Sequence, residues 1–162
     1  MKTLLLFDSY FGNTEKIARA IAKAFENDSN FQIKRNNEAT TEELSTYELL
    51  IVGSSTRGFQ PTEEVAKLIK GIKPGALKKT KIAAFDTRLA LENIHNKLLK
   101  GMVHMGGYAA KPIAARLFKK GAIQMIEPEG FYVMDTEGPL KEGELERAEA
   151  WGKKIKSLVN SH

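Results

Sequence analysis

The stretch TLLLFDSYFGNTEKIARAIAKAF, residues 3–25, decides the fold of this chain. It opens with the apolar run Thr3–Phe7, which is typical of a parallel strand covered on both faces. From Asn13 to Phe25 the apolar residues recur at helical spacing, so a helix follows the strand. The loop of residues 8–15 therefore joins the carboxyl end of a strand to the amino end of a helix.

The same alternation of strand and helix continues to the end of the chain. Apolar runs predict further strands over residues 31–35, 49–52, 82–85, and 122–126 with 131–134, the last interrupted by a turn at 128–130. Helical spacing predicts helices over residues 61–72, 108–120 and 144–159, whereas residues 90–107 carry a mixed signal. We expect Pro61 in the first turn of its helix. In the last helix we expect Leu145 to face inward and Trp151 to be a structural residue.

This order of elements favours an α/β fold in one domain, residues 1–162. Strands that alternate with helices form a parallel sheet with right-handed crossovers and helices on both faces. Such sheets bind ligands at the carboxyl ends of their strands. The loops that follow the strands are therefore the candidate site.

Composition narrows the function further. The chain has 162 residues and no cysteine, which excludes disulfide scaffolds and cysteine nucleophiles and fits a reducing cytoplasm. The longest run without a formal charge, residues 101–110, is too short to cross a bilayer, so we expect no membrane partner.

The net charge of +5 raises the question of nucleic-acid binding. Residues 67–81 hold six lysines and residues 97–120 hold six bases, and neither stretch contains an acid. Neither stretch interleaves aromatic residues in a recognised nucleic-acid module. We interpret both as a solvated basic face and expect no nucleic-acid partner.

The loop of residues 8–15 suits an anion. Small and hydroxyl residues at a helix N-terminus present backbone N–H groups and the positive end of the helix dipole. The loop has neither the Gly-Lys-Ser/Thr of a Walker motif nor the Gly-x-Gly-x-x-Gly of dinucleotide folds. Phosphate binding is one interpretation, and simple helix capping by Ser9 or Asn13 is the other.

Here the chain resembles the flavodoxin family. The pattern Leu6-Phe7-x-Ser9-x-x-Gly12-x-Thr14-x-x-x-Ala18 is similar to the flavodoxin signature. The segments at 52–56, 85–88 and 137–145 agree in order and spacing, the last with flavodoxin-like proteins related to nitric oxide synthase flavin domains. The resemblance covers nearly the whole chain and is to the short-chain type.

The resemblance implies a three-layer sandwich with a five-stranded parallel sheet of order 2-1-3-4-5, and FMN as the cofactor. It implies a phosphate loop made of Ser9, Tyr10, Phe11, Gly12, Asn13 and Thr14. It implies two loops beside the flavin ring, made of Ser54, Ser55, Thr56, Arg57, Gly58 and Phe59, and of Asp86, Thr87, Arg88 and Leu89. Asp86 would accept a hydrogen bond from the ring or act as a turn cap.

The chain also departs from the family pattern. Flavodoxins usually hold the ring between a tryptophan and a tyrosine, but the only tryptophan here is Trp151. Phe59 can supply one stacking face, Arg88 and Leu89 stand where the tyrosine would be, and Tyr108 is a remote substitute. Arginines at 57 and 88 would stabilise the negative charge of a reduced flavin and raise its potential for the second electron, unless both point to solvent.

The leading function is therefore an FMN-binding carrier of electrons between redox partner proteins, which we expect to be acidic, with the chain a monomer or weak dimer in the cytoplasm. One alternative is an FMN-dependent reductase of quinones, with residues 89–107 as a substrate wall; another is a flavodoxin-like domain without strong flavin binding. We expect no catalytic side chain. The spacing of His95, His104 and His162 predicts no metal site.

Overall fold

Six strands and five α-helices make up the part of the chain that the computed structural model describes, residues 1–90, 97–98 and 108–161. The strands are β1 (Thr3–Asp8), β2 (Phe31–Arg35), β3 (Leu49–Ser55), β4 (Lys81–Leu89), β5 (Ile123–Gln124) and β6 (Glu129–Val133). The helices are α1 (Asn13–Ala22), α2 (Thr41–Leu44), α3 (Glu63–Gly71), α5 (Ala110–Lys119) and α6 (Glu144–Asn160). Single 3-10 turns follow α1 at Lys23–Phe25 and β2 at Asn36–Glu38.

All strand pairs of the sheet are parallel, in the order β2-β1-β3-β4, with β5 and β6 both beside β4. This confirms the predicted order 2-1-3-4-5, with the fifth strand split into β5 and β6. The predicted turn at 128–130 is shorter than expected, because Glu129 and Gly130 already pair with Phe85 and Asp86 of β4.

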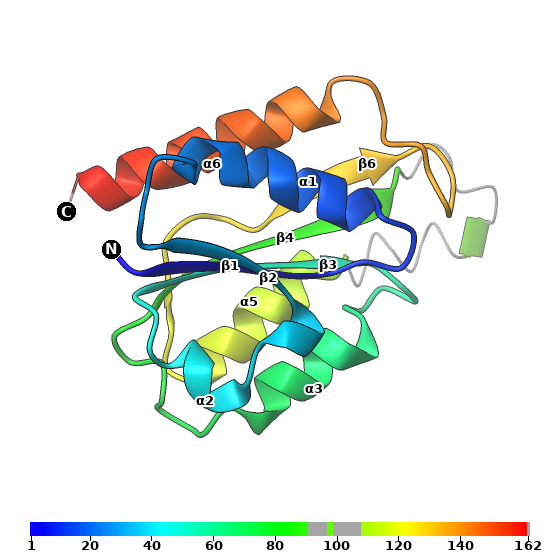
Figure 1. The fold of residues 1–162 in the computed structure, drawn as a ribbon. Helices are drawn as coiled ribbons and strands as arrows, with labels where there is room; N and C mark the ends of the chain where they lie inside the picture. Colours follow the sequence, from blue (N-terminus) through cyan, green and yellow to red (C-terminus); the bar gives the residue numbers. More distant parts are fainter. Residues whose placement is uncertain (91–96, 99–107, 162) are drawn as a thin grey trace.

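Helices cover both faces of the sheet, as Figure 1 shows, with α1 and α6 on one side and α2, α3 and α5 on the other. Successive side chains of a strand point to opposite faces, so each strand feeds two cores. Leu4, Leu6, Leu50 and Val52 belong to the core under α3 and α5. Leu5, Phe7, Leu49 and Ile51 belong to the core under α1 and α6. This double burial explains why the strands read as continuous apolar runs.

The start of α3 differs from the prediction. Pro61 is buried but lies before the helix, which begins at Glu63. The reason is the cap: the Thr62 hydroxyl accepts the Val65 N–H at 3.4 Å. A threonine that satisfies a free N–H of the first turn fixes the helix start at the next residue.

The first turn of α6 also differs, because Leu145 is exposed at 43% rather than inward. Glu144 takes the inward place, and one of its carboxylate oxygens accepts the Tyr132 N–H of β6 at 2.7 Å. Neighbouring residues of a helix lie about 100° apart around its axis, so Leu145 is turned away from the sheet. Trp151 is structural as predicted: it is 6% exposed and contacts the rings of Phe85 and Phe131 edge-on.

Candidate functional site

A pocket of about 400 Å³ lies at the carboxyl edge of the sheet. The strand register brings the ends of three strands into one row there, with Asp8 beside Ser54 and Ser54 beside Asp86. The residues that line this carboxyl-edge pocket are Tyr10, Phe11, Asn13, Ser55, Thr56, Arg57, Gly58, Phe59, Thr87, Leu89, Tyr108, Val133 and Thr136. Aromatic side chains and hydroxyls dominate this set, and Arg57 is the one charged residue among the lining residues that the structure describes.

The amino end of α1 forms one end of the site. Its first residue follows Gly12, whose φ of 90° is a left-handed conformation that suits glycine, and no side chain caps the helix. The Gly12 N–H donates to the Ser9 hydroxyl at 3.0 Å. Uncapped N–H groups and the helix dipole at this end favour a negatively charged ligand group.

Three hydroxyl groups link α1 to the ends of β3 and β4 at the pocket. Thr14 is fully buried, and its hydroxyl lies 2.8 Å from that of Ser55 and 2.7 Å from that of Thr87. The Tyr10 N–H donates to the same Ser55 hydroxyl at 3.3 Å. These bonds connect the loop after β1 to β3 and the first turn of α1 to β3 and β4.

A tight turn after β3 presents the second side of the pocket. Arg57 and Gln60 exchange backbone hydrogen bonds of 2.9 and 3.1 Å across Gly58 and Phe59. Both central residues have positive φ, 55° and 65°, which is uncommon for a phenylalanine and costs about 1 kcal/mol. The turn places Phe59 and Arg57 along the wall of the pocket.

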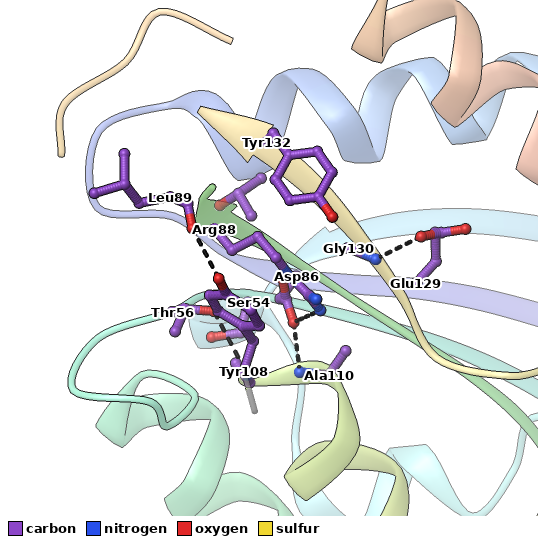
Figure 2. Close-up of polar contacts among 12 residues, drawn as sticks. Ser54, Thr56, Asp86, Arg88, Leu89, Tyr108, Ala110, Glu129, Gly130 and Tyr132 are labelled. Carbon is purple, nitrogen blue, oxygen red and sulfur yellow. Dashed lines mark hydrogen bonds and ion pairs between the residues drawn. The ribbon is translucent and has the colours of Figure 1, made fainter. Parts of the chain in front are cut away.

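Asp86 and Arg88 form a buried ion pair next to this wall, which Figure 2 shows. Arg88 donates to both carboxylate oxygens of Asp86 at 2.6 Å, and one of these oxygens also accepts the Ala110 N–H at 2.8 Å. Full burial raises the pKa of the Asp86 carboxyl, while Arg88 and the Ala110 N–H oppose that rise. In turn, the nearby carboxylate raises the pKa of the Arg88 guanidinium. Gly130 leaves the space that Arg88 occupies, since a Cβ there would lie 2.1 Å from Cζ of Arg88.

Tyr108 packs on this ion pair from the side of the pocket. The Cζ atom of Arg88 lies 4.0 Å from the centre of the Tyr108 ring, a cation–π contact. The Tyr108 hydroxyl donates to the Leu89 carbonyl at 3.0 Å (Figure 2). Burial raises the pKa of the Tyr108 phenol, so the ring remains neutral. Arg88 and Leu89 therefore fix the orientation of an aromatic wall.

The structure brings most of the residues predicted for the site to the pocket. The predicted residues that line it are Tyr10, Phe11, Asn13, Ser55, Thr56, Arg57, Gly58, Phe59, Thr87 and Leu89. The predicted residues that do not line it are Ser9, Gly12, Thr14, Ser54, Asp86 and Arg88. The carboxylate of Asp86 is occupied by Arg88 and by the first N–H of α5, and Ser54 accepts the Thr62 N–H at 2.9 Å.

Three lining residues fell outside the predicted set. Tyr108 was expected only as a remote substitute, and Val133 and Thr136 were not expected at the site. Val133 ends β6, whose carboxyl end lies at the same edge as those of β1, β3 and β4. Ligands bind at the carboxyl ends of parallel strands, so Val133 could have been predicted from its position at the end of a strand.

Other classes of site receive no support within the described ranges. These residues contain no group of three or more His, Cys, Asp or Glu that could hold a metal ion. His95, His104 and His162 lie outside these ranges, as does most of the expected substrate wall at 89–107. No helix in the described part of the chain is long and apolar enough to span a membrane.

We compared the sequence and the fold with those of known proteins. A family model described as "Flavodoxin domain" matches residues 4–127. The structure is similar to that of a flavodoxin from the domain Archaea, with a TM-score of 0.72 and 22% identity over 99% of each chain. It is similar to oxidised Flavodoxin 1 from Bacillus cereus, with a TM-score of 0.75 and 18% identity over 97% of this chain and 98% of that one. No match was found among curated proteins.

A larger protein contains the same fold. Rubredoxin oxygen:oxidoreductase from the anaerobe Desulfovibrio gigas matches with a TM-score of 0.70 and 19% identity. The match covers 98% of this chain but 36% of the other. This chain is therefore similar to one part of that protein.

Proposed function

This chain belongs to the flavodoxin family, and we propose that it binds FMN in the carboxyl-edge pocket and carries electrons between redox partner proteins. The family and the fold give a flavin-binding, electron-transfer role. One observation supports FMN as the flavin that this chain binds. An uncapped helix N-terminus and an aromatic-lined pocket meet at one edge of the sheet, and FMN has a phosphate at one end and a planar ring at the other.

The amino end of α1 is the proposed phosphate site. A Cβ at Gly12 would meet nothing within 4 Å, so the space beside this residue is open. A phosphate therefore has room to contact the backbone N–H groups there. Asn13 lines the pocket and donates through its side-chain amide to the Glu137 carbonyl at 3.1 Å. That bond holds the loop after β6 against the amino end of α1.

Phe59 and Tyr108 are the proposed aromatic walls for the ring. Both line the pocket, and they come from the turn after β3 and from the residues before α5. Stacking on such rings holds a planar ligand by its faces. A bound flavin would supply the redox chemistry, while the chain binds it, orients it and sets its electrostatic surroundings.

The test is an FMN titration of the flavin-free protein and two matched variants. Tyr108→Leu removes a proposed wall, so FMN affinity should fall by about tenfold. Tyr132→Leu is the control, since Tyr132 belongs to β6 and is not among the residues that line the pocket. Equal FMN affinity in both variants would contradict the proposed ring site.

A second assay separates the carrier from the reductase alternative. We expect the FMN-loaded protein to exchange electrons with a reduced partner protein and to show no sustained oxidation of NAD(P)H in the presence of a quinone. Multiple turnovers with NAD(P)H and quinone would instead identify a reductase. Absence of saturable FMN binding would support a domain that acts through protein interaction.

A further inference from the structure

A second concave surface lies on the far side of the sheet from α1 and α6. It is a groove of about 410 Å³ between α3 and α5, which lie side by side in Figure 1. Glu63, Ala66, Lys67, Ile69, Lys70, Arg116, Lys119 and Lys120 line it, and we call it the basic groove. Within the described part of the chain, it shares no lining residue with the carboxyl-edge pocket.

Packing α3 on α5 brings together two stretches of sequence that are rich in bases. Residues 63–81 and 108–120 together contain ten bases and two acids, which leaves fifteen bases and eighteen acids for the rest of the chain. These two stretches therefore carry an excess of eight bases over acids, and the described lining of the groove itself holds five bases and one acid, Glu63. A concentrated charge of one sign attracts a partner of the opposite sign.

The cations of the groove are held by contacts that leave their charge available. Lys120 donates to the carbonyls of Lys70 and Ile72 at 3.0 and 2.6 Å, and Arg116 donates to the Gln60 side chain at 3.1 Å. Lys67 lies 3.7 Å from Glu64, and both side chains are about two-thirds exposed, so this pair is screened by solvent. Among the described residues, no acid forms an ion pair with the other four cations of the groove.

The floor of the groove is apolar. Ala66 and Ile69 of α3 are its apolar lining residues, and of the two Ala66 is half-buried whereas Ile69 is buried at 2% exposure. This combination does not suit nucleic acid, because protein–DNA interfaces are polar and the described lining residues include no aromatic ring on which a base could stack. It suits a segment with apolar residues on one side and carboxylates on both flanks.

We propose that the basic groove docks an acidic amphipathic helix of a partner protein. Apolar side chains of that helix would contact Ala66 and the aliphatic stems of the lysines, and its carboxylates would pair with Lys67 and Lys70 on α3 and with Lys119 on α5. The bounding helices are nine and ten residues long, which gives room for about two to three turns of a docked helix. Lys70 and Lys119 lie at the ends of α3 and α5 remote from the loops of the pocket, so the partner docks without covering the site of electron exchange.

The test uses a fluorescent synthetic peptide of about four helical turns, with leucines at helical spacing and glutamates elsewhere. Its binding to the full chain is followed by fluorescence anisotropy, with FMN added and without it. The groove does not share residues with the pocket, so the expected affinity is the same in both cases and does not depend on the FMN proposal. Added salt should weaken binding.

Three variants locate the binding. Lys70→Glu combined with Lys119→Glu should weaken peptide affinity by about tenfold. Lys153→Glu combined with Lys154→Glu makes the same charge change on exposed residues of α6 and should leave the affinity within about twofold. Ala66→Gln fills the floor without changing the charge and should weaken binding as well. Urea unfolding of each variant verifies that it folds.

Several outcomes would overturn the proposal. One is equal affinity for the wild type and the Lys70→Glu, Lys119→Glu variant. Another is equal affinity for a peptide of the same composition with its leucines shuffled out of register, which would reduce the groove to a diffuse charge effect. Tighter binding of an oligothymidine through the same lysines would identify a nucleic-acid surface instead.

Discussion

Arg57 and Arg88 carry the same charge, but their surroundings give them different roles. Arg88 is occupied by the buried carboxylate of Asp86 and covered by the ring of Tyr108, so it acts as a positioning residue for the pocket wall. Arg57 is exposed, lines the pocket and lies 5.3 Å from the centre of the Tyr10 ring. Of the two arginines named from the sequence, only Arg57 is placed to stabilise negative charge on a reduced cofactor.

The variant Arg57→Gln tests this difference. Removing an exposed cation from the wall of the proposed flavin pocket should lower the reduction potential of the flavin for its second electron. The expected decrease is about 20–40 mV, the effect of one screened charge pair. Arg116→Gln removes the same charge from the basic groove and should leave the potential unchanged. Potentiometric titration of the FMN-loaded proteins gives both values, and an equal shift in the two variants would assign the effect to net charge.

The Asp86–Arg88 pair makes a prediction about stability. Asp86→Asn leaves the guanidinium of Arg88 without its carboxylate and should lower the free energy of unfolding by about 3 kcal/mol. Adding Arg88→Met removes that unpaired charge, while the side-chain amide that replaces the carboxylate keeps an oxygen for the Ala110 N–H, so most of the loss should be recovered. Urea unfolding of the flavin-free proteins measures both; a double variant less stable than Asp86→Asn would contradict the account.

At the scale of elements, α6 is fixed to the sheet by charged groups at its amino end. Glu144 accepts the Tyr132 N–H of β6 and pairs with Arg147 at 2.7 Å, and Arg147 also contacts Glu129 at 3.0 Å. Farther along, Gly152 allows close approach to α1, since a Cβ there would lie 2.6 Å from the Ile21 carbonyl oxygen. The helix is thus held at one end by hydrogen bonds and along its length by packing.

Replacing Glu144 should make the free energy of unfolding less dependent on pH. Burial raises the pKa of Glu144, but bonds from Arg147 and Tyr132 outweigh it and hold the pKa below its ordinary value of 4.5. The ionised group therefore stabilises the fold fully above about pH 4.5, and this contribution is lost as the pH falls through the lowered pKa. Glu144→Gln should cost about 2 kcal/mol at pH 7 and much less at pH 3.

The exposed Glu146 on the same turn is the control for this measurement. Glu146→Gln should change the free energy of unfolding by less than about 0.5 kcal/mol at either pH. Urea unfolding at the two pH values tests both variants. A deficit of Glu144→Gln that stays the same at pH 3 would contradict the proposed role of its charge.

Local pattern predicted the elements well, and contacts between distant segments account for what it missed. Thr3–Phe7 and Leu49–Val52 are apolar because both faces of their strands are covered, and this signal is readable in sequence. The position of Tyr108 is not readable in that way. It depends on Asp86 and Arg88 of β4, which hold the start of α5 and the tyrosine ring through contacts across about twenty residues of chain.

At the scale of the molecule, the carboxyl-edge pocket and the basic groove are separate surfaces. Among the described residues, Arg57 is the charged residue that lines the pocket at the carboxyl edge of the sheet, while five bases line the groove between α3 and α5. The sequence predicted a basic face but not that two distant stretches form a single groove. This separation is what allows docking and electron exchange to be proposed for different surfaces.

The most direct measurement is a comparison of FMN and riboflavin binding to the flavin-free protein by quenching of flavin fluorescence. We expect saturable binding of one FMN per chain, at least about tenfold tighter than that of riboflavin, because only FMN has a phosphate for the amino end of α1. Equal affinity for the two flavins would contradict the phosphate site. Failure of both to bind would contradict the pocket as a flavin site.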